Sequence, residues 1–216
     1  MRSYGEYCAI AKSLDVVGDR WTLLIVRELA LRDGSRYTDL RNGLPGIATN
    51  LLAERLRELE ANGLVLREEA PPPVASTLFR LTPRGEELRP VLDGLTRWGL
   101  PMMRELGPED TVRSHWLAGA LQLLLEDHRP EQPPATVELQ IGDQPIVLEL
   151  RGKVGVTLGA TGDPDATVEG PPTPVMGLLL GRLTPADARV SGVTVRGDES
   201  LLDRVGAAPS AVQAAS

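Results

Sequence analysis

The sequence predicts an α+β protein in two parts, each with its own pattern of apolar residues. In residues 1–107, apolar residues at helical spacing are interrupted by a tight Gly/Pro turn and followed by two short strand-like runs. In residues 108–206, apolar and polar residues alternate in several runs that lie between apolar helices. Charge divides at the same place: residues 1–107 carry 15 basic and 15 acidic side chains, and the remainder carries 8 and 15. We therefore expect two domains, with residues 207–216 as a flexible tail.

The composition limits the classes of protein that fit this chain. It has 216 residues, of which 42% are hydrophobic, so it can bury two cores. No apolar run approaches the ~20 residues that a membrane span needs, and the start of the chain lacks the apolar core of a signal peptide. A single cysteine excludes an internal disulfide. These features predict a cytoplasmic protein without a membrane partner.

The first 35 residues predict two packing helices. Ala9 to Val17 and Trp21 to Leu29 have helical spacing, and Asp19 stands where it can cap the second helix. Next come a short helix around Tyr37 to Leu40, a turn at 43–46, and an amphipathic helix from Thr49 to Glu60. Two strands, 64–67 and 77–81, follow around a Pro-rich tip. This order is typical of a winged helix-turn-helix, in which the second helix enters the DNA major groove.

The predicted recognition helix has two faces. Leu52, Leu56 and Leu59 recur at i, i+4 and i+7 and should be buried, whereas Asn50, Glu54, Arg57 and Ala61 should project outward. Thr49 and Asn50 lie in the first turn, which usually reaches base edges. Asn can pair with adenine, and Arg with guanine or a phosphate. The DNA-binding candidates are Arg36, Tyr37, Thr49, Asn50, Arg55, Arg57, Arg67, Ser76, Thr77 and Arg80. Arg55 lies beside the apolar stripe, so a salt bridge within the protein is as good an interpretation as a phosphate contact.

A long helix from Pro83 to Met102 is expected next, kinked or loosened by Pro90. Its apolar residues include Leu95 and Trp98 and exceed what a small domain needs for its own core. Pairing with a second copy would bury them, and a homodimer fits the paired half-sites that such DNA readers use.

The second part predicts an α+β domain with an antiparallel or mixed sheet. A helix is expected at 111–127, after a linker or tight turn at 106–110. Strands are expected at 136–141, 145–151, 153–159, 165–169 and 193–196, and helices at 174–183, after Thr184 and from Asp198. The acidic balance of this part opposes contact with phosphates.

The first part resembles the HxlR family of winged helix-turn-helix transcription regulators. The matching features, in order over about residues 4–104, are Cys8, the stretches 14–21, 24–29, 44–47, 55–59, 63–65 and 81–83, and Trp98-Gly99. The resemblance implies a DNA-binding regulator with flanking dimerisation helices and double-stranded DNA as its partner. The family often has Ser-Pro and a basic residue where this chain has Ala48-Thr49-Asn50, so the operator sequence does not carry over.

The second part resembles the sterol-carrier-protein lipid-binding fold, through the stretches 163–167, 179–188 and 191–198. That resemblance implies an apolar tunnel and a hydrophobic small-molecule effector. The pocket candidates are Trp116, Leu121, Leu125, Met176, Leu179 and Leu180. Periodicity alone assigns the same residues to an ordinary core.

The remaining motifs predict no enzyme. His115 and His128 have no metal-ligand spacing, no nucleophile–base pattern is readable, and the glycines of 152–162 lack a phosphate-loop order, so no metal or cofactor is expected. Some relatives in the family use a cysteine as a redox sensor, which makes Cys8 a candidate. The competing interpretation, a buried small hydrophobe, is favoured for an unpaired cysteine. A lipid carrier whose winged domain serves only dimerisation is the alternative function.

Overall fold

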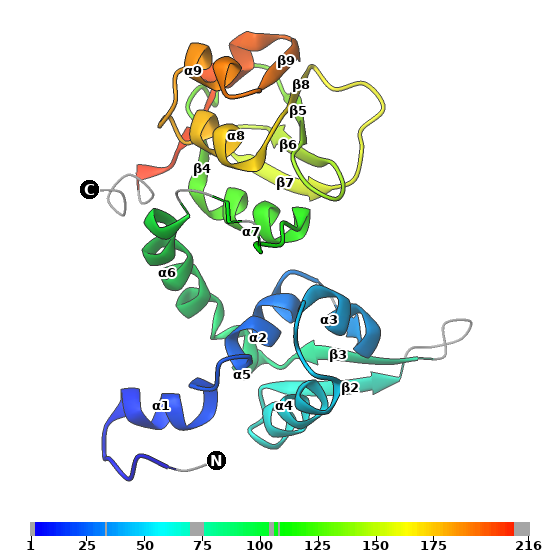
Figure 1. Ribbon diagram of the computed structural model, residues 1–216, viewed down its shortest axis with the longest axis vertical. Helices are drawn as coiled ribbons and strands as arrows, with labels where there is room; N and C mark the ends of the chain where they lie inside the picture. The colour runs from blue at the N-terminus through cyan, green and yellow to red at the C-terminus, as the bar shows by residue number, and fades with distance from the viewer. Residues whose placement is uncertain (1–2, 33, 70–75, 104–105, 108, 210–216) are drawn as a thin grey trace. The chain divides into compact units, whose positions relative to one another are not determined.

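The computed structural model describes residues 3–32, 34–69, 76–103, 106–107 and 109–209 (Figure 1). Within it the chain forms two compact units, Met1–Gly94 and Leu95–Ser216. The boundary falls inside a helix that begins in one unit and ends in the other. Each unit has its own core, so each is described by itself.

The N-terminal unit is helical with a small sheet. Its elements are α1 (Ala9–Val17), α2 (Thr22–Ala30), β1 (Ser35–Arg36), α3 (Tyr37–Gly43), α4 (Thr49–Ala61), β2 (Val65–Glu69), β3 (Thr77–Leu81), α5 (Pro83–Glu86) and the start of α6 (Arg89–Gly99). The helix-turn-helix and the ribbon are present as the sequence predicted. The core forms where α2, α3 and α4 converge on the sheet, and it includes Ile25, Leu40, Leu52 and Phe79.

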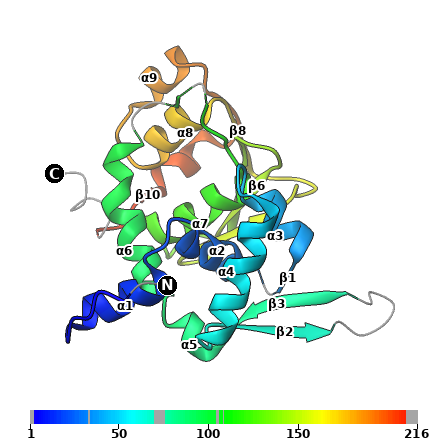
Figure 2. The ribbon, with the colours of Figure 1, turned by 60° about the horizontal axis from the view of Figure 1, so that its bottom comes forward.

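The three-stranded sheet of this unit has the order β1-β3-β2, and both pairings are antiparallel. β2 and β3 form the wing, which projects past α4 in Figure 2. Its predicted Pro-rich tip at 71–73 lies outside the described residues. β1 has only two residues, Ser35 and Arg36, and was not predicted because a run this short shows no alternation.

The long helix predicted from Pro83 to Met102 is wrong as a single element. α5 ends at Glu86, with Thr82 accepting the N–H of Gly85 at its start, and α6 begins at Arg89. Pro90 therefore occupies the second position of a new helix, where its missing N–H costs no hydrogen bond. A 3-10 turn, η1 (Leu100–Met102), continues α6.

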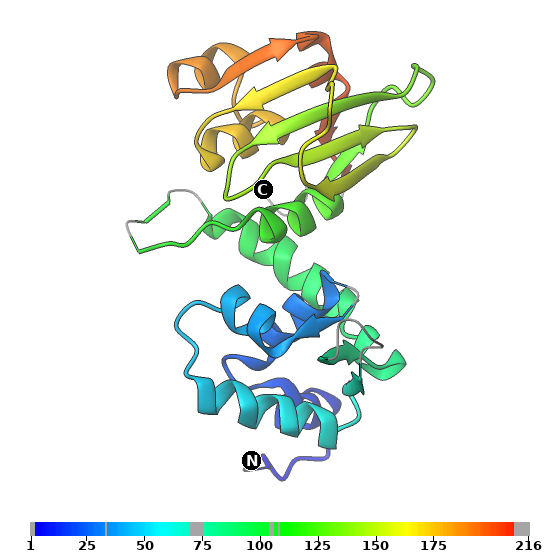
Figure 3. The same cartoon turned by 90° about the vertical axis from the view of Figure 1, so that its right-hand side faces the viewer.

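The C-terminal unit packs helices against a mixed sheet, whose strands lie side by side in Figure 3. Its elements are α7 (Ser114–Leu124), β4 (Leu125–Asp127), β5 (Ala135–Gln140), β6 (Ile146–Leu150), β7 (Val154–Leu158), β8 (Ala166–Glu169), α8 (Pro172–Leu179), α9 (Pro185–Val190), β9 (Thr194–Gly197), η2 (Glu199–Asp203) and β10 (Val205–Ala207). The sheet has the order β7-β6-β5-β8-β9, in which only the β5–β8 pairing is parallel.

Two details of this unit differ from the sequence prediction. The helix expected at 111–127 ends at Leu124, because Leu125 to Asp127 form strand β4. β4 pairs with β10, so Ala207, expected to begin the tail, lies opposite Leu125. Residues 210–216 lie outside the described residues.

A buried ion pair joins these late strands to the rest of the C-terminal unit. The side chains of Asp127 and Arg204 are 0% and 1% exposed. Arg204 donates from Nε and Nη2 to the two carboxylate oxygens of Asp127, at 2.8 Å each, and from Nη1 to the carbonyl of Pro133 at 2.6 Å. Asp127 also accepts the backbone N–H groups of Arg129 and Gly152. The pair is thus fully hydrogen-bonded, the condition under which buried charges are tolerated.

Candidate nucleic-acid interface

Helix α4 presents its polar face to solvent. Leu52, Leu56 and Leu59 are at most 2% exposed and pack into the N-terminal core. Asn50, Glu54, Arg57 and Ala61 are exposed on the other side, as the helical period predicted, and Thr49 is exposed in the first turn. Arg57 makes no ion pair with any described residue; its Nε donates only to the carbonyl of Ala53. The outer face of α4 therefore offers amide, hydroxyl and guanidinium groups that can reach a ligand.

The start of α4 is held in place by the preceding helix. The hydroxyl of Tyr37 donates to the carbonyl of Thr49 at 2.6 Å. In the turn, Leu44 is 1% exposed and anchors the chain, while Gly46 has φ +86°, a backbone conformation that only glycine adopts without strain. Tyr37 thus fixes the first turn of α4, and its predicted contact with DNA stays a prediction.

Arg55 is engaged within the protein. Its side chain is 11% exposed, and its guanidinium lies 2.6 Å from Glu58, 3.1 Å from Asp19 and 3.4 Å from Glu54. Of the two interpretations that the sequence left open, the structure favours the internal salt bridge. Asp19 precedes α2, so the pair ties α4 to the neighbouring helix.

The arginines of the wing also have acidic neighbours. Arg67 Nε lies 3.0 Å from Glu60, and its guanidinium lies over the ring of Phe79. Arg80 donates from Nε to Glu68 across the hairpin, at 2.7 Å. A phosphate would have to compete with these carboxylates. The two predicted polar residues of the wing are partly buried, and Thr77 donates to Glu69.

Two exposed arginines, one just before α3 and one within it, complete the basic surface of this unit. Arg36 was predicted, and its backbone N–H donates to Asp39 at the start of α3. Arg41 was missed; it is exposed and makes no ion pair with any described residue. The helical period does not single it out, because Arg41 directly follows the buried Leu40 and lies only about a quarter turn from it.

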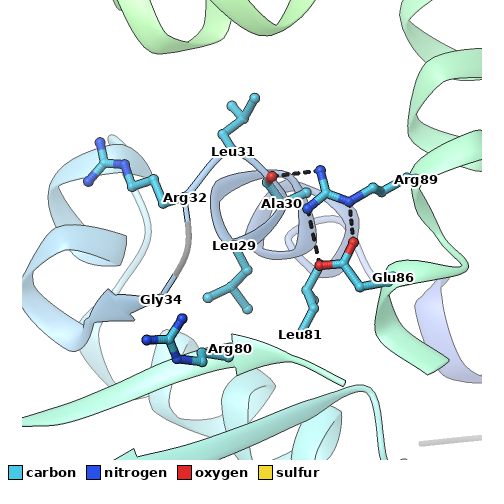
Figure 4. Close-up of a pocket in the computed structure, with 9 residues that line it drawn as sticks. All are labelled: Leu29, Ala30, Leu31, Arg32, Gly34, Arg80, Leu81, Glu86 and Arg89. Atoms are coloured by element: carbon cyan, nitrogen blue, oxygen red, sulfur yellow. Dashed lines mark hydrogen bonds and ion pairs between the residues drawn. The ribbon is translucent and has the colours of Figure 1, made fainter. Parts of the chain in front are cut away.

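The residues predicted to line a ligand pocket lie in the C-terminal core. Leu121 and Leu179 are at most 1% exposed, Leu125 and Leu180 are also buried, and Met176 packs against the same cluster. Trp116 is half-buried, with its ring edge-on to His115. In the N-terminal unit, an open pocket of about 350 Å³ lies between the end of α2, β3 and the first turn of α6 (Figure 4).

Cys8 is exposed, so the expectation of a buried small hydrophobe is wrong. It is the residue before α1, next to the backbone N–H groups of the first turn. The N–H of Ala11, and to a lesser extent that of Ile10, lowers the pKa of the Cys8 thiol from its usual value. Partial positive charge at a helix start favours the thiolate in the same way.

Among the described residues, no three His, Cys, Asp or Glu side chains are grouped so that they could hold a metal ion. The helices in the described part of the chain are also too short or too polar to cross a membrane.

Comparison with known proteins supports the helix-turn-helix assignment. The model of the family described as HxlR-like helix-turn-helix matches residues 16–106. The transcriptional regulator YvaP of Bacillus subtilis is 34% identical over 87 residues, which are 40% of this chain and 80% of that protein. The regulator sll1512 of Synechocystis is 35% identical over 95 residues, 44% of this chain and 70% of that protein. A solved structure, the reduced form of the transcriptional regulator YodB from B. subtilis, is 29% identical and covers 49% of this chain and 100% of its own, with a TM-score of 0.40.

Proposed function

Because the chain belongs to the HxlR-like helix-turn-helix family of DNA-binding transcriptional regulators, we propose that it regulates transcription by binding a specific duplex sequence as a homodimer. The single observation that carries the proposal is the outer face of α4. There Thr49, Asn50 and Arg57 are exposed together, on a helix whose opposite face is fully packed. A rigid helix with free hydrogen-bonding groups at its start suits insertion into the major groove.

Each residue of the proposed interface has a distinct role. The Asn50 amide can donate to N7 and accept from N6 of adenine, so it reads sequence. Arg57, one or two turns further along the helix, and the exposed Arg36 and Arg41 contact phosphates and set the position of the helix. Arg67 and Arg80 reach the flanking backbone only after exchanging Glu60 and Glu68 for phosphate oxygens. The Arg55 guanidinium remains in its ion pairs and supports α4.

The proposed homodimer follows from the apolar faces of two helices. On α6, Val91, Leu95 and Trp98 are 45–69% exposed, and no residue of that helix is buried. On α1, Ile10 and Leu14 are exposed at helical spacing. Side chains of this size rarely gather on the outside of a monomer, and a two-fold contact would cover both copies of the same face.

Two finer roles belong to the proposal as well. A hydrophobic effector in the C-terminal unit rests on the resemblance to sterol carriers, and native mass spectrometry of the purified chain tests it by detecting a co-purified apolar molecule. A redox role for Cys8 rests on its exposure and on the lowered pKa of its thiol. Such a thiolate is the form that oxidants and electrophiles attack.

The test of DNA recognition begins with selection of preferred duplexes from a random library by the full chain. Affinity for the selected duplex is then measured at several salt concentrations for Asn50→Ala, Arg57→Gln and Arg55→Gln. Asn50→Ala should cost about 1–3 kcal/mol on the selected sequence and much less on random DNA. Arg57→Gln should weaken both and reduce the slope of log K against log salt by about 1. Arg55→Gln should leave that slope unchanged.

The matched control is Arg182→Gln, which removes an exposed arginine of the C-terminal unit. Unchanged binding for both Asn50→Ala and Arg57→Gln would overturn the assigned interface. Failure to select any sequence, together with tight uptake of fatty ligands, would favour a carrier instead.

A further inference from the structure

Arg89 joins two helices of the N-terminal unit that are far apart in the chain. It is the first residue of α6, and its Nη1 donates to the carbonyl of Ala30, the last residue of α2, at 2.7 Å. Its Nε and Nη2 donate to the two carboxylate oxygens of Glu86, where α5 ends. Figure 4 shows the guanidinium between these two partners. Such a cation satisfies one of the last carbonyls of a helix, which have no partner within the helix itself.

The opposite end of α2 is tied to the proposed recognition helix. Asp19, in the turn before α2, lies 3.1 Å from the guanidinium of Arg55 on α4. Between the two contacts, α2 has 9 residues, and Ile25 and Val26 are both 0% exposed in the core. A helix of this length spans about 14 Å and is held straight by close packing. α2 therefore connects the recognition helix to the start of α6.

A second connection between the same two helices follows the chain. The backbone N–H of Thr82 donates to the carbonyl of Leu64, just beyond α4, at 3.0 Å. Gly85 of α5 lies so close that a Cβ there would be 2.1 Å from the Leu64 carbonyl oxygen. α5 is thus held directly against the segment that leaves α4, and the turn at 87–88 then joins α5 to α6.

The two connections together fix the direction in which α6 starts. The turn at 87–88 by itself would let α6 pivot on α5, because each of its residues contributes two soft dihedral angles. Leu88 and Leu92 pack against the N-terminal core, but apolar contacts are not directional. The hydrogen bond of Arg89 to α2 is directional, and it closes the loop of contacts. The first turns of α6, up to Gly94, accordingly belong to the N-terminal unit.

We propose that Arg89 is a positioning residue that fixes the angle between α6 and the recognition helix, and so sets which spacing of two half-sites the homodimer accepts. α6 carries the exposed Val91, Leu95 and Trp98 of the proposed dimer contact, so a change in its angle moves the second copy of α4. Paired half-sites lie a helical turn of DNA or a multiple apart, which makes affinity sensitive to that distance. The role in spacing rests on the proposed function, whereas the contact between α2 and α6 does not.

The spacing is tested with paired copies of the selected half-site, whose separation is varied in steps of one base pair. The unmodified chain should bind one separation best. Arg89→Gln should reduce the affinity ratio between the best and the next-best separation at least about threefold, and should leave affinity for a single half-site within about twofold, because α4 is untouched. Arg89→Lys keeps the charge without the planar fork, so its ratio should fall between those two.

Arg84→Gln is the matched control. Arg84 pairs with Glu87 at the same spacing in sequence as the Arg89 pair, but it makes no hydrogen bond or ion pair with the described residues of α2. It should keep the spacing preference of the unmodified chain. Full discrimination in Arg89→Gln, or an equal loss in both variants, would overturn the proposal. A lower mass of Arg89→Gln in sedimentation would also overturn it, because the residue would then be needed for pairing rather than for its geometry.

A measurement without DNA separates the contact from the regulatory role. In the full chain, hydrogen exchange at the backbone N–H groups of residues 91–94 should be at least about threefold faster in Arg89→Gln than in the unmodified chain, and unchanged in Arg84→Gln. Equal exchange in all three chains would overturn the proposal, because α6 would be held without Arg89. If the unmodified chain prefers no separation, the proposed homodimeric reader fails, and the exchange rates still decide whether Arg89 holds α6 to α2.

Discussion

Cys8 combines exposure with a thiol whose pKa is lowered by the backbone N–H groups of Ala11 and Ile10. Because the thiolate is the reactive form, the rate of alkylation by iodoacetamide should reach half its maximum at a lower pH in the folded chain than in the same chain unfolded by urea. The chain has one cysteine, so the labelling is unambiguous. Equal midpoints in the two states would show that the helix start does not activate this sulfur.

The Asp127–Arg204 pair makes a second residue-scale prediction, on stability. The guanidinium of Arg204, followed by the backbone N–H groups of Arg129 and Gly152, lowers the pKa of Asp127 below its usual range. A carboxyl whose folded pKa is depressed stabilises the fold fully above its unfolded pKa of about 3.9, and that contribution is lost as the pH falls through the folded value. Acid should therefore weaken the C-terminal unit below about pH 5.

Asp127→Asn should lower the free energy of unfolding of this unit by about 3–5 kcal/mol near neutral pH, because it leaves the Arg204 charge buried without a counter-charge. Urea unfolding, followed by hydrogen exchange in β4, β6 and β10, measures the change. The double variant Asp127→Leu with Arg204→Met removes both charges and should recover most of the loss. The pair would be of little consequence if the single variant unfolded at the same urea concentration as the unmodified chain from pH 7 to pH 3.

At the scale of elements, the arginines of the wing are paired with nearby acidic residues. Arg67 lies 3.0 Å from Glu60 of α4. The guanidinium that we propose to bind the DNA backbone is therefore already paired with a carboxylate. Glu60→Gln removes this competitor and a negative charge that repels phosphates. Affinity for random duplex DNA at low salt should rise about two- to tenfold, and the salt slope should steepen.

The matched control for the wing is Glu169→Gln, which breaks an ion pair of similar geometry with Arg196 in the C-terminal unit. It should leave DNA affinity unchanged. An equal rise for both variants would mean that net charge alone governs binding, and that the wing has no particular part in it.

The sequence predicted most elements because their apolar residues repeat over enough positions for the helical or strand period to be recognised. In α4 the spacing of Leu52, Leu56 and Leu59 is sufficient to place Asn50 and Arg57 outside. The spacing could not decide the role of Arg55, because its position at the edge of the stripe fits both roles until the fold brings Asp19, from the turn before α2, beside it. The exposure of Cys8 depends likewise on whether a neighbouring element covers the start of α1.

Long-range pairing of strands and charges could not be predicted from the sequence, for a physical reason. β1, β4 and β10 have two or three residues each, too few for an alternation. They exist because a distant partner satisfies their backbone groups. Asp127 and Arg204 are 77 positions apart, and no local pattern distinguishes either of them from a surface charge. The walls of the N-terminal pocket come from four separate segments, so no local pattern could place them together.

For the whole molecule, regulation depends on the proposed assembly of two copies, since one exposed α4 reads one half-site. The apolar residues Leu95 and Trp98 on α6 are 45% and 69% exposed, and a charge among them would be desolvated in a two-fold contact. Trp98→Glu should therefore convert a dimer into a monomer in sedimentation or native mass spectrometry.

Loss of the dimer should weaken binding to a two-half-site duplex by at least about a hundredfold, because the second helix no longer binds at high effective concentration. Affinity for a single half-site should change little, since α4 is intact. Val190→Glu is the matched control: it adds the same charge at an apolar residue of α9 that is 91% exposed, and both the mass and the affinity should stay as they are. If the Trp98→Glu chain remained dimeric, the dimer contact would lie elsewhere. If the unmodified chain were monomeric yet bound paired half-sites tightly, no dimer would be needed for binding.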